Sequence, residues 1–245
     1  MTAAPTLGIV LPLYNERSRV ARTFDEVLLW AHRKPHWQFL LVDDGSLDGG
    51  GEELRRLHQE RPASNTEVLV LPANGGKCRA IRRGFERLQT DRLCFTDGDL
   101  AFSLDHVERL ETALDRFDVA IGNRNLVQQH ENTSIRRRMI GGVFNRLVRV
   151  LLSLPYHDTQ AGLKGFRAPA ARAIFARQRI ASFGFDAELL CIARRLGLTI
   201  GEIPARVLDD HNYKLGKVKL LKDSLLMLGD IFRIQANLRR HRYDA

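Results

Sequence analysis

The chain has little of what marks several classes of protein. It has only three cysteines in 245 residues, scattered and without metal-ligand spacing, so we expect free thiols in a reducing compartment. No run reaches the roughly 18 consecutive apolar residues of a membrane span. The apolar stretch Leu7–Leu13 is too short for a signal peptide and contains Pro12. These absences predict a cytoplasmic protein.

Acidic residues are also in deficit. The 29 Asp and Glu residues face 38 Lys and Arg residues, which gives a net charge of +9. Such an excess indicates an anionic partner: nucleic acid, a membrane surface or a phosphorylated substrate. The sequence carries no helix-turn-helix, zinc-finger or RNP motif. A nucleic-acid-binding module is therefore the least favoured of the three, and we expect no nucleic acid partner.

Short apolar runs alternate with amphipathic segments in the first half of the chain. The runs predict strands at 7–13, 39–42, 68–71, 93–96 and 119–121, with the first strand ending at Pro12. Helices are predicted at 18–31, with Ser18 as the N-cap, and at 52–60, 77–88 and 104–117. This alternation predicts an α/β fold with a mostly parallel, doubly wound sheet flanked by helices.

The pattern loosens after Arg124. Helices are predicted at 134–152, 169–177, 186–196 and 217–240, with a strand at 199–203 and an irregular stretch at 158–167. The sequence shows no repeat and no linker. We therefore expect one domain over residues 1–212, followed by a C-terminal helical appendage over residues 213–245.

Two carboxylates follow the strand predicted at 93–96, in the turn Asp97-Gly98-Asp99. Carboxylates at this spacing can converge on one divalent cation, Mg²⁺ or Mn²⁺, which in turn binds a diphosphate. A solvated turn is the alternative when the motif is taken alone. A second acidic turn follows an earlier strand, and ligands of open α/β sheets bind at the carboxyl ends of strands. The two turns together therefore suggest a single nucleotide site.

Three other motifs lie at neighbouring positions of the predicted sheet. Tyr14 and Glu16 follow the first strand, where they can stack on a base and accept from a ribose, or form a polar loop and helix cap. Asp43 and Asp44 follow the second strand, where they can accept from a base N–H or form an Asx turn. The glycine-rich turn before Lys77 opens a basic helix and can hold phosphate, although it is no Walker A sequence.

In order and spacing, these motifs resemble those of family 2 glycosyltransferases. The chain is most similar to the polyprenyl-phosphate branch, which includes the dolichyl-phosphate glucosyltransferase and dolichyl-phosphate mannose synthase types. The segments 122–124, 158–166 and 185–190 strengthen the likeness, which spans residues 7–228. The resemblance implies a GT-A fold, meaning a Rossmann-like, mostly parallel sheet that binds a nucleoside diphosphate sugar.

The resemblance also implies roles for individual residues. The donor would be bound by Pro12, Tyr14, Asn15, Glu16, Asp43, Asp44, Gly45, Lys77, Asp97 and Gly98, and the Mg²⁺ or Mn²⁺ ion by Asp97 and Asp99. Arg124 and Arg137 would hold the acceptor phosphate, and the sugar pocket would be formed or oriented by Asp158, Gln160, Lys164, Asp186 and Glu188.

Two positions depart from the family pattern. Cys78 stands where the family often has glycine, and Ala101 stands where mannose synthases can place a metal-binding glutamine. The second departure favours the glucosyltransferase type. It leaves a third protein ligand of the metal unassigned.

The implied reaction is an inverting transfer of a hexose to polyprenyl or dolichyl phosphate, with UDP-glucose favoured as donor and GDP-mannose next. A phosphate acceptor is already an anion at neutral pH, so a general base has little to remove. The alternative is a saccharide or other hydroxyl acceptor, for which Asp186 or Glu188 could act as the base.

Basic and apolar residues are interleaved over the predicted helix at 217–240. A basic amphipathic helix can lie on an anionic membrane surface, or it can pack on the core with a solvated basic face. We expect peripheral association with the cytoplasmic face of a membrane, or a separate membrane protein partner, because related enzymes can carry membrane helices and this sequence shows none.

Overall fold

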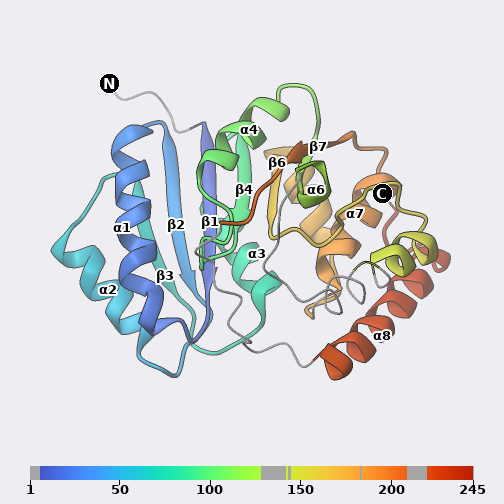
Figure 1. Cartoon of the computed structure of the whole chain (residues 1–245), viewed down its shortest axis with the longest axis horizontal. Coiled ribbons are helices and arrows are strands. Elements are labelled where there is room, and N and C mark those ends of the chain that lie inside the picture. The colour runs from blue at the N-terminus through green and yellow to red at the C-terminus, as the bar shows by residue number, and fades with distance from the viewer. Residues whose placement is uncertain (1–5, 128–141, 143–144, 183, 209–219, 245) are drawn as a thin grey trace.

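A central β-sheet lies between two layers of helices in the computed structural model, which describes residues 6–127, 142, 145–182, 184–208 and 220–244 (Figure 1). Within these residues the strand order is β3-β2-β1-β4-β6-β5-β7. The strands are β1 (Leu7–Leu13), β2 (Trp37–Asp43), β3 (Thr66–Val70), β4 (Arg92–Thr96), β5 (Val119–Asn123), β6 (Leu163–Arg167) and β7 (Ile200–Pro204).

The helices alternate with these strands along the chain. They are α1 (Arg17–Arg33), α2 (Gly50–Glu60), α3 (Lys77–Arg87), α4 (Asp105–Ala113), the 3-10 turn η1 (Arg124–Leu126), α6 (Ala168–Arg177), α7 (Phe185–Arg195) and α8 (Leu220–Arg239). Residues 145–151 are also helical, whereas most of the remaining helix predicted at 134–152 lies outside the described residues.

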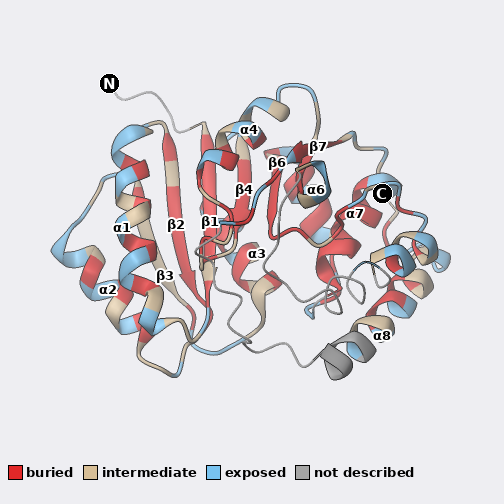
Figure 2. Ribbon diagram, in the orientation of Figure 1, coloured by how far each residue is buried: buried red, intermediate tan, exposed pale blue. Residues whose placement is uncertain are grey.

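The central strands are mostly apolar because both faces of the sheet are covered. Alternate residues of each strand face opposite sides: Val10 and Leu40 belong to one hydrophobic cluster, and Ile9 and Leu41 belong to the other. Figure 2 shows the strands and the inward faces of the helices as buried. Strands buried on both faces are typical of parallel sheets. The predicted α/β architecture is confirmed.

One strand was missed by the sequence prediction. The stretch 158–167 was predicted to be irregular, but its last five residues form β6, which is antiparallel to both β4 and β5. Lys164 and Gly165 interrupt the apolar pattern that identifies a strand. In the fold Lys164 is fully buried, and Gly165 lies against Leu110 and Leu114 of α4.

The start of α1 differs from the prediction. Ser18 lies inside the helix, and the N-cap is Glu16, which makes no side-chain capping bond. Asp48 does the capping from another loop, because its Oδ2 accepts from the Arg17 amide at 2.9 Å. Strand β1 also continues through Pro12 to Leu13, which is tolerated because β1 pairs with β4 only as far as Val10.

Helix α8 confirms that the C-terminal segment is helical. Ile231 and Ile234 are buried in the same cluster as the α7 side chains, so α8 packs on the core. Leu226 and Phe232 are exposed on it. Within the described part of the chain, we find no helix with the length and apolarity needed to cross a bilayer. The domain boundary at residue 212 stays a prediction.

Gly84 allows α3 to approach the sheet closely. A Cβ at this position would lie 2.6 Å from a methyl carbon of Val10 in β1. Gly84→Ala should therefore lower the free energy of unfolding by about 1–3 kcal/mol through overpacking, despite the better helix propensity of alanine.

Gly229 of α8 is a matched control, since no atom lies within 4 Å of the position of its Cβ. Gly229→Ala should raise the free energy of unfolding by up to about 1 kcal/mol. Urea denaturation followed by circular dichroism measures both changes. Equal effects of the two substitutions would contradict the close approach of α3 to β1.

Candidate active site

The acidic turns lie together at one edge of the sheet. Asp43 ends β2, Asp97 and Asp99 follow β4, and Tyr14 follows β1, which lies between these two strands. Because β1, β2 and β4 are parallel, their carboxyl ends meet at the same edge. This is the place where open α/β sheets bind ligands.

The turn after β4 is packed tightly onto β1. A Cβ at Gly98 would lie 2.4 Å from the Pro12 carbonyl oxygen, and the Gly98 carbonyl accepts from Thr23 Oγ1 at 2.8 Å. Leu100 has a left-handed backbone with φ of 53°. Such a conformation costs about 1–2 kcal/mol for a residue with a side chain. The surrounding structure therefore fixes the direction of the Asp97 and Asp99 side chains.

Asp97 forms an ion pair with Lys77, the first residue of α3. Burial by itself lowers the pKa of Lys77, but the charges of Asp97, Asp186 and Asp99 outweigh burial and raise that pKa above its ordinary value. Gly162 closes the other side, because a Cβ there would lie 1.9 Å from Asp97 Oδ2. Only glycine fits beside this carboxylate. The sequence prediction did not single out Gly162, although it lies within the segment 158–166.

A second ion pair lies beneath the first. Lys164 Nζ donates to Asp186 Oδ1 at 2.5 Å and to the Ala161 carbonyl at 2.6 Å, and its side chain is fully buried. The ammonium groups of Lys77 and Lys164 lie 5.5 and 5.8 Å from the ring centre of Phe95. Lys164 thus lies in the interior of the protein, next to the site. Its predicted contact with the sugar is disfavoured by this burial.

Asp99, like Asp97, has a partly exposed side chain. Its Oδ1 accepts from the Ala101 amide at 3.2 Å, and its Oδ2 lies 3.9 Å from Arg19 Nη1. Arg19 also lies 3.6 Å from Glu16, so it bridges the β1 loop and the β4 turn. Arg19 was not among the predicted site residues. A cation in the first turn of a helix opposes the helix dipole, which is a signal that the sequence did contain.

Asp44 holds the glycine-rich turn in place. It accepts from Asn74 Nδ2 at 2.9 Å and from the Gly75 and Gly76 amides at 3.1 and 2.7 Å. Burial raises the pKa of Asp44, and the hydrogen bonds from Gly75 and Gly76 oppose this only in part. Asp44 therefore holds a distant turn, whereas the local contact that an Asx turn predicts is made by Asp43, which accepts from the Ser46 amide. Contact of Asp44 with the nucleoside stays a prediction.

Asp43 and Asn15 join the β1 and β2 loops through Ser46. Asp43 accepts from the amide and the hydroxyl of Ser46, and the Asn15 amide donates to Ser46 Oγ at 2.8 Å. Gly45 has a left-handed φ of 69°, and its Cβ position lies 2.4 Å from the backbone of Ala73. Tyr14 remains exposed beside these loops, as a base-stacking role requires.

Arg124 and Asp158 form a bidentate ion pair. Arg124 Nε and Nη2 donate to Asp158 at 2.7 and 3.0 Å, and the Arg124 amide adds a third bond at 3.1 Å. Burial tends to raise the pKa of Asp158, but the hydrogen bonds and charge of Arg124 outweigh it and lower that pKa. The sequence prediction gave these two residues to different substrates. The structure brings them together, while Arg137 lies outside the described residues.

Glu188 and Gln160 make contacts with the protein that a sugar pocket would not require. Glu188 is fully buried and accepts from the Arg179 and Ile180 amides, from Gln178 Nε2 and from the Tyr243 hydroxyl. It therefore lies in the scaffold and not in the open site. Gln160 Nε2 donates to Met227 Sδ of α8 at 3.3 Å, so this side chain faces the C-terminal helix.

Cys78 stands where the family often has glycine, but the glycine-rich turn before α3 forms nonetheless. Its side chain is buried, and burial raises the pKa of the thiol to about 12. The left-handed backbone that the turn needs is supplied by Gly76, with φ of 88°.

In the described part of the chain, no three or more His, Cys, Asp or Glu side chains gather as a metal site.

Replacing Arg124 tests the pair with Asp158. The lowered pKa of Asp158 means that the pair stabilises the fold above the ordinary carboxyl pKa of 3.8 and that this stabilisation is lost as pH falls through the lowered value. Arg124→Met leaves a buried carboxylate without its partner. We expect a loss of about 1–3 kcal/mol at pH 7 that shrinks as pH falls below 3.8 through the lowered pKa of Asp158.

Denaturation of both proteins across this pH range measures the difference. Arg55→Met, at an exposed position of α2, is the control and should change stability little at either pH. A loss that is the same at pH 7 and well below pH 3.8 would contradict the assignment.

Comparison with known proteins agrees with this geometry. Residues 8–175 match the model of a family described as glycosyl transferase family 2. A dolichyl-phosphate beta-glucosyltransferase of Trichomonas vaginalis is 30% identical over 251 residues, which cover 96% of this chain and 76% of that protein. The dolichyl-phosphate beta-glucosyltransferase of Saccharomyces cerevisiae is 29% identical over 250 residues, covering 94% and 74%.

A solved structure has the same architecture. Glucosyl-3-phosphoglycerate synthase of Mycobacterium tuberculosis, in complex with Mn²⁺, UDP and glucosyl-3-phosphoglycerate, superposes with a TM-score of 0.63 at 17% identity, covering 95% of this chain and 80% of that one. At this identity the likeness is one of fold, and it confirms the predicted GT-A architecture. From its motifs, sheet and relatives together, the chain belongs to glycosyltransferase family 2, in the branch of the dolichyl-phosphate glycosyltransferases.

Proposed function

We propose that the protein transfers glucose from UDP-glucose to dolichyl or another polyprenyl phosphate, with inversion, at a membrane surface. The observation that carries this proposal is the placement of Asp97, Asp99 and Lys77 at the carboxyl edge of the sheet in a chain whose relatives are named dolichyl-phosphate beta-glucosyltransferases. A solved protein with this fold holds UDP, which supports a uridine donor.

Asp97 and Asp99 fit a divalent cation that carries the donor diphosphate. Both are hard oxygen donors with partly exposed side chains, and Gly162 leaves room for the Asp97 carboxylate where any larger residue would displace it. When bound, Mg²⁺ or Mn²⁺ would supply charge compensation for the leaving diphosphate. Lys77 contributes a second positive charge beside Asp97.

The nucleoside is assigned to the loops after β1 and β2. Tyr14 is exposed and can stack on the base, while Pro12, Asn15 and Glu16 shape the edge beside it. Asp43, Asp44 and Gly45 hold that edge through backbone hydrogen bonds and a left-handed turn. A rigid edge lowers the entropy that binding would otherwise cost.

The acceptor is assigned to the Arg124 side of the site. Asp158 occupies the Nε and Nη2 edge of the Arg124 guanidinium and fixes its plane, so the acceptor phosphate would bind at the Nη1 side of that group. Arg137 stays a proposed second phosphate ligand. No general base is needed, because the nucleophile is already ionised at neutral pH.

A hydroxyl acceptor is not supported by the two residues that could have provided a base. Asp186 accepts a hydrogen bond from the Lys164 ammonium, and Glu188 accepts hydrogen bonds from four donor groups of the protein. Neither carboxylate is open to a substrate. The phosphate acceptor is therefore the better fit.

We further propose that the protein binds peripherally at the cytoplasmic face of a membrane, either directly or through a membrane protein partner. Helix α8 exposes Leu226 and Phe232 together with Arg233 and Arg239, and the exposed Arg240 directly follows it. Apolar and basic side chains on one helix suit an anionic lipid surface. The acceptor class that we propose is itself found at such a surface.

Replacing Asp99 tests the metal and diphosphate assignment. Asp99→Asn removes a charge that the donor complex requires, so kcat should fall about 100-fold or more while the melting temperature stays within a few degrees. Transfer of radiolabelled glucose from UDP-glucose to undecaprenyl or dolichyl phosphate, with Mg²⁺ or Mn²⁺, measures the rate.

Asp105→Asn is the matched control, since Asp105 is an exposed residue at the start of α4. It should retain the wild-type rate. Absence of transfer by the wild-type enzyme with any common nucleotide sugar would reject the proposed function.

Gly162→Ala tests the cradle around Asp97. The added methyl group must displace the carboxylate, so kcat/KM for the donor should fall at least tenfold, and the stabilisation by UDP with Mn²⁺ in a thermal melt should shrink. Gly229→Ala, on α8, is the control and should leave both quantities unchanged. Wild-type donor kinetics in Gly162→Ala would show that Asp97 is not held as described.

A further inference from the structure

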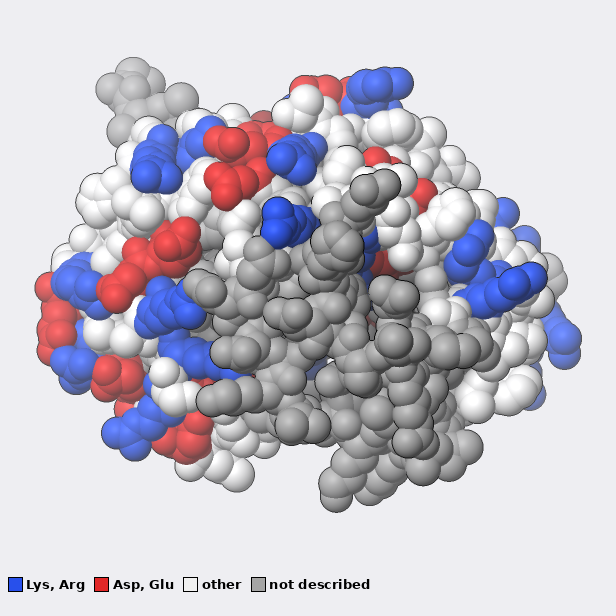
Figure 3. Space-filling model, viewed as in Figure 1, with Lys and Arg blue, Asp and Glu red and all other residues white. Residues whose placement is uncertain are grey.

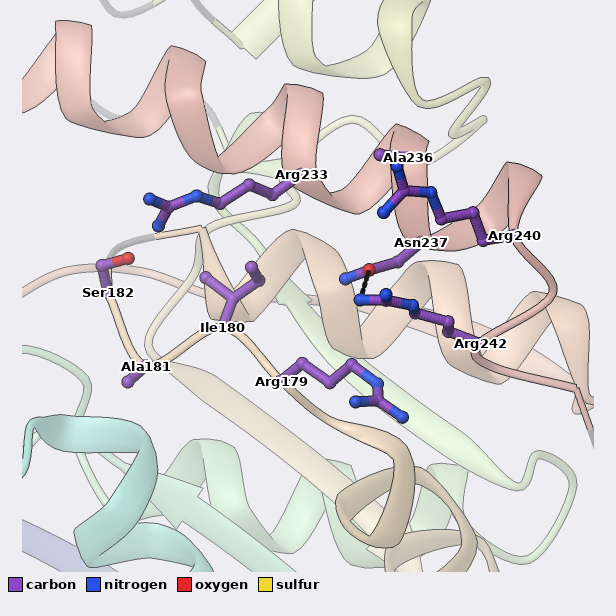
Figure 4. A pocket seen from close by; sticks show the side chains of 9 residues that line it. All are labelled: Arg179, Ile180, Ala181, Ser182, Arg233, Ala236, Asn237, Arg240 and Arg242. Atoms are coloured by element: carbon purple, nitrogen blue, oxygen red, sulfur yellow. Dashed lines mark hydrogen bonds between the residues drawn. The ribbon is translucent and has the colours of Figure 1, made fainter.

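A pocket of about 550 Å³ lies between α8 and the loop 179–182, outside the site at Asp97 (Figure 4). Four of its lining residues are arginines: Arg179 from the loop, Arg233 from α8, and Arg240 and Arg242 just after α8. Ser182 and Asn237 add polar groups. We call this the arginine pocket.

The arginine pocket has little negative charge to balance its guanidinium groups. No carboxylate lines it. Arg233 lies 3.8 Å from Asp230, a loose pair with 75% of the Arg233 side chain exposed, and Arg242 donates to a neutral acceptor, Asn237 Oδ1, at 3.3 Å. Within the part of the chain that the structure describes, the side chains of Arg179 and Arg240 have no recorded hydrogen bond or ion pair.

Three of the arginine side chains come together from two segments of the chain. Figure 4 shows Arg240 and Arg242 extending toward Asn237 and Arg179 reaching the same region from the loop, whereas Arg233 extends the other way, toward Ser182. On the face of the molecule shown in Figure 3, basic and acidic side chains are mixed over α1 and α2, whereas basic ones predominate at the opposite end, where the C-terminal segments lie. The pocket therefore lies at a positively charged end of the molecule.

Buried carboxylates fix the loop that forms one wall. Glu188 accepts from the amides of Arg179 and Ile180, and Asp230 accepts from Ser182 Oγ at 2.7 Å and from the Gly184 amide at 3.2 Å. Both carboxylates are buried. The wall is thus held at both ends before any ligand binds, which favours binding over an unstructured cluster of arginines.

We propose that the arginine pocket binds a phosphate group, either on the headgroup of an anionic lipid or as free phosphate. Guanidinium forks match phosphate oxygens, and an anion would relieve the repulsion among the like charges of Arg179, Arg240 and Arg242. The lipid source is favoured because Leu226 and Phe232 are exposed on α8, the helix that carries Arg233, and Arg240 directly follows that helix. The proposal does not depend on which sugar the enzyme transfers.

The first experiment uses inorganic phosphate as the probe and calorimetry of the full chain as the readout. The double variant Arg179→Gln with Arg240→Gln should weaken phosphate binding at least tenfold. The control, Arg172→Gln with Arg55→Gln, removes the same charge from exposed positions of α6 and α2, away from α8, and should keep phosphate affinity within about twofold of the wild type. UDP binding with Mn²⁺ should be unchanged in both, which shows that both fold.

The second experiment distinguishes the source of the phosphate group. Co-sedimentation with phosphatidylglycerol and phosphatidylcholine vesicles should fall at least tenfold for the pocket variant and much less for the control if a lipid headgroup is the ligand. If only free phosphate binding separates the two variants, the pocket binds a soluble phosphate. If the two variants behave alike with both probes, or neither probe binds the wild type, the proposal is wrong.

Discussion

Two ammonium–carboxylate pairs around the ring of Phe95 are the constraint on which the centre of the molecule depends. An ammonium group removed from water costs several kcal/mol unless a carboxylate compensates it in place. Lys164 comes from β6 and Asp186 from α7, while Lys77 begins α3 and Asp97 follows β4. The charges of Lys77 and Lys164 are therefore compensated only when four segments are in position together. The same interactions that complete the fold also orient the carboxylates of the site.

The parallel half of the sheet could be predicted because its strands are buried on both faces and read as uninterrupted apolar runs. Strand β6 could not, because Lys164 and Gly165 break that pattern for reasons that lie elsewhere in the chain: an acid 22 residues later and the close packing of α4. The cap of α1 was missed for the same reason. Asp48 reaches it from a loop 31 residues away, which no local rule about Ser18 can reveal.

The location of the site was easier to predict than its contacts. Strand ends place Asp43, Asp97 and Tyr14 at one edge in any sheet of this kind. Residue type alone does not reveal that Arg124 and Asp158 form an ion pair. Nor does it reveal that Glu188 accepts its hydrogen bonds from the loop 179–182 and from Tyr243. A charged side chain meets whichever partner the fold brings to it, and these partners are separated by 34 and 55 residues.

The raised pKa of Lys77 has a consequence for how the enzyme responds to its surroundings. A lysine whose pKa is higher in the folded protein than in the unfolded chain contributes stability below about pH 10.4, and this contribution is lost only as pH rises through the folded value. Across the range met in cells, the charge beside Asp97 is therefore constant. Acidification of the cell would change the protonation of phosphate groups that reach the site, while the charge of Lys77 would stay the same.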